Sequence, residues 1–138
     1  QKADMSVINT CSVTNMADRK SRQMLHKAKK NNPDSIVVAT GCYVQTSEKE
    51  VLNDLSVDIV IGNDRKHDLV RLLEEYSLDS VNDTVDDIND GKHDFEELFI
   101  DQTKEHTRAF IKVQDGCNQF CSYCIIPYCR GRVLSRSI

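Results

Sequence analysis

Short apolar runs that alternate with helical segments constrain the fold of this chain more than any other feature. Three such runs, residues 6–10, 35–40 and 57–62, have the length and composition of buried strands. Apolar runs of roughly four to eight residues between turn signals are typical of strands that are covered on both faces. Each run is followed by apolar residues at helical spacing, and a repeated strand–helix order favours a parallel sheet.

Signals at the helix ends support this interpretation. A helix is expected over about residues 17–31, with Asn15 or Asp18 as its N-terminal cap. The next helix opens with a capping box, in which Ser47 is paired with Glu50. Both helices therefore follow a strand run after a short connection.

A third helix completes the unit. It is expected to start at Asn63 or Asp64, and its apolar stripe has the spacing i, i+3, i+4, i+7. The residues of this stripe are Leu69, Leu72, Leu73 and Tyr76. The predicted fold class is α/β, with a three-layer parallel sheet of the Rossmann or flavodoxin type in residues 1–76.

The first helix has a basic outer face. Its cationic residues are Arg19, Lys20, Arg22, Lys27, Lys29 and Lys30. Such a face is most often simply solvated, and contact with RNA is the alternative.

Charge divides the rest of the chain into two parts, although the whole chain carries a net charge of only −4. Residues 77–106 hold ten acidic residues against Lys92 and Lys104, which is typical of a solvated linker with at most one strand or hairpin. Residues 107–138 are basic, and a strand over 107–114 is expected to lead into a cluster of cysteines. A cationic segment suits an anionic cofactor or a phosphate backbone. No run approaches the roughly 18 apolar residues of a membrane span, so no membrane partner is expected.

Three cysteines of the basic segment, Cys117, Cys121 and Cys124, have the spacing C-x3-C-x2-C. Three thiolates this close in sequence can each bind a different iron of a [4Fe–4S] cluster and leave one iron open. The open iron can chelate the amino and carboxylate groups of a small molecule. A zinc site with Cys129 as the fourth ligand, a disulfide scaffold and a redox pair are weaker alternatives.

Two further cysteines follow the first two strand runs. Cys11 comes directly after the first run, and Cys42 comes two residues after the second. Because the carboxyl ends of parallel strands lie at one edge of a sheet, both thiols are expected to face the same crevice. A shared cluster requires their Cα atoms to lie within about 15 Å of each other. Two unrelated buried thiols are the alternative.

Four motifs, in this order, resemble the methylthiotransferase family of radical S-adenosylmethionine (SAM) enzymes. They are "NTCSVTNMADRKSRQ", "ATGCYVQ", "DGCNQFCSYCIIPY" and "RGR". The resemblance implies an N-terminal α/β domain with an auxiliary [4Fe–4S] cluster, then a radical-SAM barrel and a C-terminal RNA-binding domain of the TRAM type. By this resemblance Cys11 and Cys42 are two of three auxiliary-cluster ligands. Cys117, Cys121 and Cys124 would hold the second [4Fe–4S] cluster, which binds SAM.

The resemblance also sets the expected domain organisation. Residues 1–76 would be the N-terminal methylthiotransferase domain without its start, 77–106 the acidic linker, and 107–138 the beginning of the radical-SAM domain. The third auxiliary ligand, most of the barrel and the TRAM domain would then lie in parts of a longer protein. The 138-residue chain by itself is expected to be catalytically inactive.

The implied function is the transfer of a methylthio group to C2 of N6-threonylcarbamoyladenosine, next to the tRNA anticodon. One SAM would supply the methyl group, and a second would be cleaved reductively to a 5′-deoxyadenosyl radical. The implied partners are tRNA and an electron donor of the flavodoxin or ferredoxin type, in the cytoplasm. The alternative within the family is an enzyme that acts on isopentenyladenosine in tRNA or on an aspartate of a ribosomal protein. A non-catalytic zinc- or iron–sulfur-binding module that contacts RNA is the alternative outside it.

One residue departs from the family pattern. Cys129 stands where family members usually have Thr or Ala. We expect it to be a spare thiol that is neither a ligand nor a catalyst.

Overall fold

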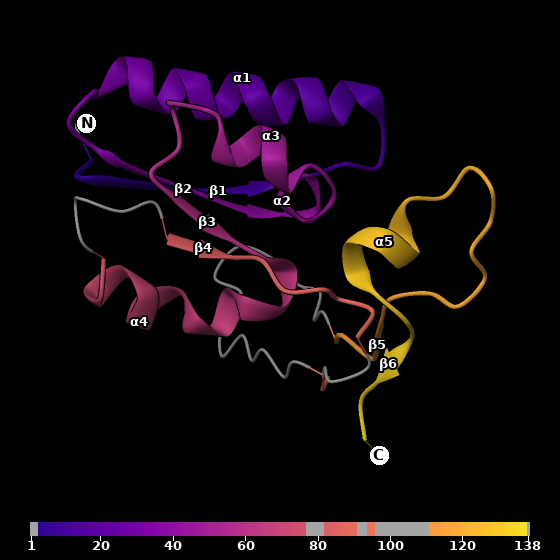
Figure 1. The fold of residues 1–138 in the computed structure, drawn as a ribbon. Helices are drawn as coiled ribbons and strands as arrows, with labels where there is room; N and C mark the ends of the chain where they lie inside the picture. The colour runs from indigo at the N-terminus through magenta and orange to yellow at the C-terminus, as the bar shows by residue number, and fades with distance from the viewer. Residues whose placement is uncertain (1–2, 77–81, 91–93, 96–110, 138) are drawn as a thin grey trace.

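A computed structural model of the chain describes residues 3–76, 82–90, 94–95 and 111–137. Its main feature is a four-stranded sheet in which each neighbouring pair of strands is parallel (Figure 1). The strands, in their order across the sheet, are β1 (Met5–Thr10), β2 (Ile36–Gly41), β3 (Ile59–Ile61) and β4 (Asn82–Thr84). The expected α/β class with a parallel sheet is confirmed.

Helices cover both faces of this sheet, which makes three layers (Figure 1). They are α1 (Asn15–Asn31), α2 (Cys42–Thr46), α3 (Glu48–Leu52), the 3₁₀ helix η1 (Asn63–Asp68) and α4 (Leu69–Glu74). One core cluster joins α1, α2 and α3 to the sheet and includes Leu25, Val44 and Val51. A second cluster on the opposite face packs Leu72 of α4 against the sheet.

The apolar run of β2 explains the two cores. Val37 and Ala39 contribute to the first cluster, whereas Val38 between them contributes to the second. Successive side chains of a strand point to opposite faces, so a strand that is covered on both sides needs an uninterrupted apolar run.

Two of the expected helix caps are wrong. The N-cap of α1 is Thr14, whose Oγ1 accepts a hydrogen bond of 3.1 Å from the Ala17 backbone N–H, and Asn15 is already helical. α3 does follow Ser47, but the Ser47 side chain makes no capping hydrogen bond. Glu50 instead accepts a hydrogen bond of 3.1 Å from the Tyr43 hydroxyl, because the buried ring of Tyr43 brings that hydroxyl alongside α3.

The sequence allowed for one strand within the acidic linker, and β4 is such a strand; it pairs with β3 through Ile59 and Asn82 and so extends the sheet beyond residue 76. Of the predicted strand 107–114, residues 107–110 lie outside the described residues, and only Gln114 of the remainder is in a strand. The domain boundaries themselves stay a prediction.

The described C-terminal segment is a looped hairpin with one short helix. β5 (Gln114–Asp115) pairs antiparallel with β6 (Leu134–Ser135), and α5 (Ile126–Arg130) lies between them in the sequence. α5 packs against α2 beside the carboxyl edge of the sheet (Figure 1). No helix among the described residues is long and apolar enough to cross a membrane.

Candidate functional site

Cys11 and Cys42 lie together at the carboxyl edge of the sheet, as the sequence predicts. Their preceding residues, Thr10 and Gly41, are register partners on β1 and β2. Adjacent strands are about 4.8 Å apart and consecutive Cα atoms about 3.8 Å, so the two cysteine Cα atoms are at most about 12 Å apart. This separation satisfies the limit of about 15 Å that a shared cluster requires.

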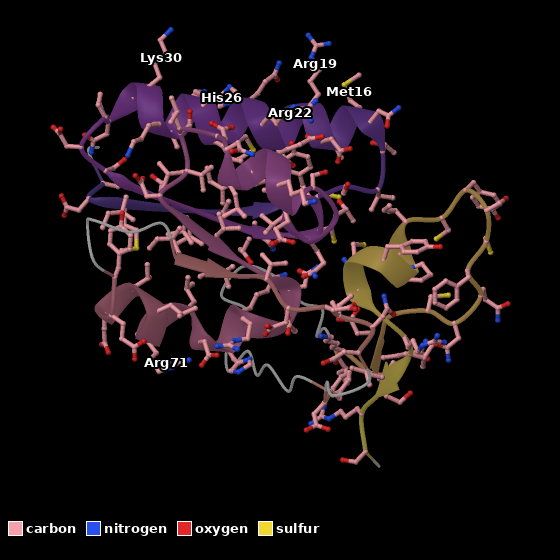
Figure 2. The ribbon with its side chains drawn as sticks, in the orientation of Figure 1. Met16, Arg19, Arg22, His26, Lys30 and Arg71 are labelled. Atoms are coloured by element: carbon pink, nitrogen blue, oxygen red, sulfur yellow. The ribbon has the colours of Figure 1, made fainter. Side chains whose placement is uncertain are left out.

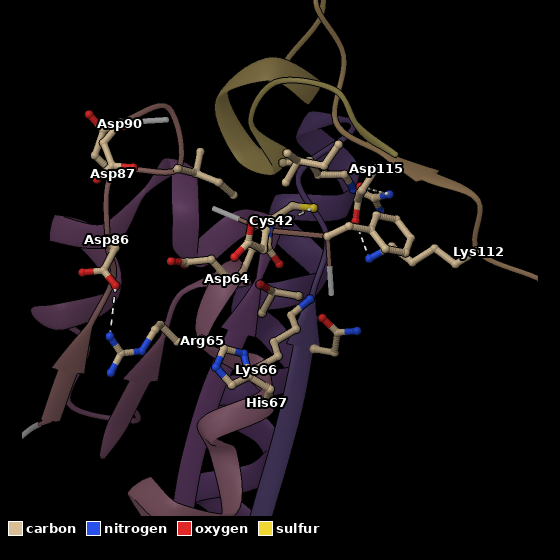
Figure 3. A pocket seen from close by; sticks show the side chains of 18 of the residues that line it. Cys42, Asp64, Arg65, Lys66, His67, Asp86, Asp87, Asp90, Lys112 and Asp115 are labelled. Carbon is tan, nitrogen blue, oxygen red and sulfur yellow. Dashed lines mark hydrogen bonds and ion pairs between the residues drawn. The ribbon is translucent and has the colours of Figure 1, made fainter. Parts of the chain in front are cut away.

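Both cysteines line one cavity of about 1210 Å³, and Figure 3 shows Cys42 within it. Drug-sized ligands occupy pockets of roughly 300–1,000 Å³, so the cavity has room for a cofactor and a substrate group. Charged side chains from several segments surround it, among them Asp64, Lys66 and Asp115. The cavity therefore joins the carboxyl edge of the sheet to the C-terminal hairpin.

Gly41 makes the sharp turn that places Cys42 at this edge. Its φ is +104°, and a Cβ atom built there would lie 2.3 Å from the Thr10 carbonyl oxygen. Only glycine adopts this conformation without strain, and only glycine leaves room for the neighbouring strand. The chain can thus pass from β2 directly into α2, whose first residue is Cys42.

Two hydroxyl groups hold the cysteine-bearing segments in place. Ser21 Oγ of α1 donates to the Cys11 carbonyl oxygen (3.1 Å) and accepts from the Cys11 N–H (3.2 Å). Thr46 Oγ1 of α2 lies 3.0 Å from the Cys42 carbonyl oxygen and 3.2 Å from Ser12 Oγ. The backbone at both cysteines is therefore anchored to the helices that cover the sheet.

The surroundings of the Cys42 thiol favour its ionised form. Hydrogen bonds from the Cys129 thiol, from Arg130 and from Asn63 lower the pKa of Cys42 to about 5, with the Cys129 bond the largest cause, although burial opposes the shift. Asn63 Nδ2 lies 3.8 Å from Cys42 Sγ, and Arg130 is also within 3.6 Å of the Asp115 carboxylate. The thiolate is the form that binds metals, so this environment prepares Cys42 to be a ligand.

Cys129 is the unexpected member of this group. It is completely buried on α5, and its pKa is raised mainly by its hydrogen bond to Cys42. Asn63 Nδ2 also donates to the Cys129 carbonyl oxygen, so one amide links α5 to η1 and Cys42. The sequence identified Cys129 only as a spare thiol, and Asn63 only as a possible helix start. Arg130 belongs to a quoted motif, but nothing in the sequence places these three residues beside Cys42.

The other three cysteines lie on the loop between β5 and α5. The base of this loop is closed by a hydrogen bond of 3.1 Å from the Cys117 N–H to the Gly131 carbonyl oxygen. Gly116 permits the closure, since its φ is +71° and a Cβ there would lie 2.1 Å from the Arg132 carbonyl oxygen. A turn follows in which the Cys124 N–H donates to the Cys121 carbonyl oxygen at 2.9 Å.

Aromatic contacts stiffen the middle of the loop. The rings of Phe120 and Tyr128 meet edge to face at 5.8 Å, and the Arg132 guanidinium lies 5.2 Å from the Phe120 ring centre. Tyr123, just before the last cysteine of the spacing, is 90% exposed. The loop thus has a closed base, while its tip stays open to solvent.

The donor chemistry of the loop fits an iron–sulfur cluster, because Cys117, Cys121 and Cys124 are free thiols and Cys121 is exposed. The positions of these three thiols differ from those of the ligands of an assembled cluster. Within the described residues, no three Cys, His, Asp or Glu side chains are grouped closely enough to hold a metal ion. The ligand assignments at both sites therefore rest on cysteine spacing, on the shared sheet edge and on resemblance.

Comparison with known proteins agrees with the motifs. Residues 1–62 match the model of "Uncharacterized protein family UPF0004". The chain is 45% identical over 135 residues to "Threonylcarbamoyladenosine tRNA methylthiotransferase MtaB" of Aquifex aeolicus, covering 96% of this chain and 32% of that protein. It is 42% identical over 138 residues to the protein of the same name in Bacillus subtilis, covering 99% of this chain and 30% of that protein.

A relative with a different substrate in its name is less similar. Identity is 34% over 143 residues to "tRNA-2-methylthio-N(6)-dimethylallyladenosine synthase" of a Sulfurihydrogenibium species, covering 100% of this chain and 32% of that protein. The chain spans about a third of the length of these relatives.

Proposed function

We propose that the protein containing this chain is a radical-SAM tRNA methylthiotransferase. The chain is homologous to the methylthiotransferases over nearly its whole length. The target is C2 of N6-threonylcarbamoyladenosine beside the anticodon. The observation that carries this proposal is the identity of 45% to an enzyme named for that substrate, against 34% to one named for dimethylallyladenosine. The partners are a tRNA substrate and an electron donor of the flavodoxin or ferredoxin type, and the location is the cytoplasm.

Two sets of cysteines have separate roles in this proposal. Cys117, Cys121 and Cys124 hold the [4Fe–4S] cluster that binds SAM, and Cys11 and Cys42 are two of the three ligands of the auxiliary [4Fe–4S] cluster. When bound, these groups supply the reductive cleavage of SAM and the sulfur that is transferred.

The residues around Cys42 support its proposed role as a ligand of the auxiliary cluster. Asn63 and Arg130 donate toward the Cys42 sulfur, and hydrogen bonds of this kind orient metal ligands and tune clusters. The packing of α5 on α2 also brings the end of the SAM-cluster loop to the auxiliary site. Asp115 and Arg130, which flank the cysteine loop in the sequence, line the cavity together with Cys11 and Cys42, whereas Cys117, Cys121 and Cys124 do not line it.

Mass spectrometry of tRNA nucleosides from cells with and without the full-length gene tests the proposal. We expect deletion to remove 2-methylthio-N6-threonylcarbamoyladenosine and to leave the unmethylthiolated nucleoside in its place. Loss of the methylthio derivative of isopentenyladenosine instead, or of a modification on a ribosomal protein, would contradict the substrate. Metal analysis distinguishes this enzyme from a non-catalytic zinc-binding module. Two [4Fe–4S] clusters require about eight iron and eight sulfide ions per chain, whereas a zinc module contains no sulfide.

A further inference from the structure

The outer face of α1 carries several exposed cationic side chains, with Met16 and Gln23 exposed among them. α1 is 17 residues long, or about 25 Å, and it is the outermost layer on its side of the sheet (Figure 2). Four exposed cations, which we call the α1 stripe, lie within an arc of about 100° on this face. They are Arg19, Lys20, Lys27 and Lys30. The stripe extends about 16 Å along the helix axis, and Arg19 is nearer than Lys30 to the edge that carries Cys11 and Cys42.

The other cationic side chains of α1 are used within the protein. Lys29 Nζ binds the Asp58 carboxylate at 2.8 Å, and Arg22 donates to the Tyr43 hydroxyl at 3.2 Å while it lies 5.5 Å from the ring centre. His26 Nε2 is 2.8 Å from the Asp54 carboxylate. In the part of the chain that the structure describes, the four stripe residues make no such contact. Their charges are thus available to a partner.

Charge complementarity indicates what that partner is. Residues 1–76 contain eleven basic and eleven acidic residues, so the stripe gathers positive charge on one face of a part of the chain that is neutral as a whole. Asp18, the one acidic residue of the helix, is in its first turn and half-buried. Cations spaced along a rigid rod match the repeated charges of a nucleic-acid backbone, and the tRNA of the proposed function is such a polyanion.

We propose that the α1 stripe binds backbone phosphates of the tRNA substrate, at a distance from the modified base. This inference rests on the proposed function and adds a substrate-binding surface to it. Phosphate contacts of this type position a nucleic acid without reading its sequence. The stripe would therefore contribute to affinity and orientation rather than to the choice of nucleoside.

The test measures binding of unmodified tRNA to the full-length, cluster-loaded protein at several salt concentrations. The logarithm of the binding constant falls as the logarithm of the salt concentration rises, and each lost phosphate contact makes this negative slope shallower by about 0.7 to 0.9. We expect a variant with Arg19→Gln, Lys20→Gln, Lys27→Gln and Lys30→Gln to make that slope shallower by about 3 and to weaken binding about tenfold or more at 0.1 M salt. Glutamine is a good helix former, and all four positions are exposed, so the fold should be kept.

Arg71 provides a matched control. It lies on α4, on the opposite side of the sheet from α1, and is similarly exposed (Figure 2), although unlike the stripe residues it is ion-paired, with Asp68 at 3.1 Å and Glu75 at 3.4 Å. Lys27→Gln should make the salt slope shallower by about 0.7 to 0.9, whereas Arg71→Gln should leave it unchanged. SAM cleavage in the absence of tRNA should be equal in all variants, because none of these residues lines the cavity.

Three results would overturn the inference in distinguishable ways. An unchanged salt slope in the fourfold variant, with normal modification of tRNA, would refute the stripe alone. Unchanged tRNA binding with loss of reduction by the electron donor would assign the stripe to an acidic protein instead. A wild-type protein that binds no tRNA at all would refute the proposed function together with the stripe.

Discussion

Replacing Cys129 by Ala should raise the pKa of Cys42 and narrow the pH range in which this thiol is ionised. The pKa of Cys42 is lowered from 9.0 to about 5. The causes that lower it are hydrogen bonds from Cys129, Arg130 and Asn63 and the positive charge of Arg130, and the Cys129 bond is the largest of them. Since the Cys129 bond is the largest cause that lowers the pKa of Cys42, its loss should raise this pKa toward the ordinary value of a cysteine.

The assay is brief alkylation of the cluster-free protein with iodoacetamide between pH 4 and pH 10. Mass spectrometry then measures the modified fraction of the peptide that carries Cys42. Because the thiolate is the reactive form, the midpoint of the pH profile reports the pKa directly. We expect a midpoint near 5 in the wild-type protein and a higher midpoint in Cys129→Ala.

Cys129→Ser is the matched control, since its hydroxyl retains a hydrogen-bond donor at the same position. Its midpoint should lie closer to that of the wild type than to that of Cys129→Ala. The reasoning fails if Cys129→Ala leaves the midpoint unchanged, or if the wild-type midpoint lies near the ordinary cysteine value of about 8.5. Either result would mean that Cys129 does not stabilise the Cys42 thiolate.

Three further substitutions test the site and the fold. Cys121→Ala in the full-length enzyme should abolish 5′-deoxyadenosine formation but keep the auxiliary iron, and continued SAM cleavage would exclude the loop as the SAM site. Gly41→Ala should lower both stability and auxiliary iron content, because the added Cβ would lie 2.3 Å from the Thr10 carbonyl oxygen; wild-type values for both would show that the turn relaxes. Leu25→Ala, at a fully buried position, should reduce the free energy of unfolding by about 2–5 kcal/mol in urea titrations, and a loss below about 1 kcal/mol would mean that this core is loosely packed.

The strand–helix order and the sheet edge at which Cys11 and Cys42 meet can both be predicted without knowledge of the fold. Both follow from local patterns: apolar runs that form strands, apolar spacing that forms helices, and the rule that parallel strands end at one edge. The register of Thr10 with Gly41 then confirms the pairing of the two cysteine-bearing segments. No contact between distant residues had to be known for this inference.

Local signals were less reliable where several residues compete for one bond. Thr14, Asn15 and Asp18 can all cap a helix, and the structure selects Thr14. Likewise, Glu50 binds Tyr43 instead of completing a capping box with Ser47, because the core fixes the position of the Tyr43 ring. Packing thus decides between local alternatives that are close in free energy.

The residues that surround Cys42 are brought there by packing between segments that are far apart in the sequence. β4 comes from a segment rich in Asp and Asn, which have low strand propensity, and it is a strand because β3 offers an edge to pair with. In the same way, Cys129 and Arg130 reach Cys42 because α5 packs on α2, and Asn63 joins them because η1 starts at the same edge. Contacts between segments far apart in the chain have no local signature, since they depend on how whole elements pack against one another.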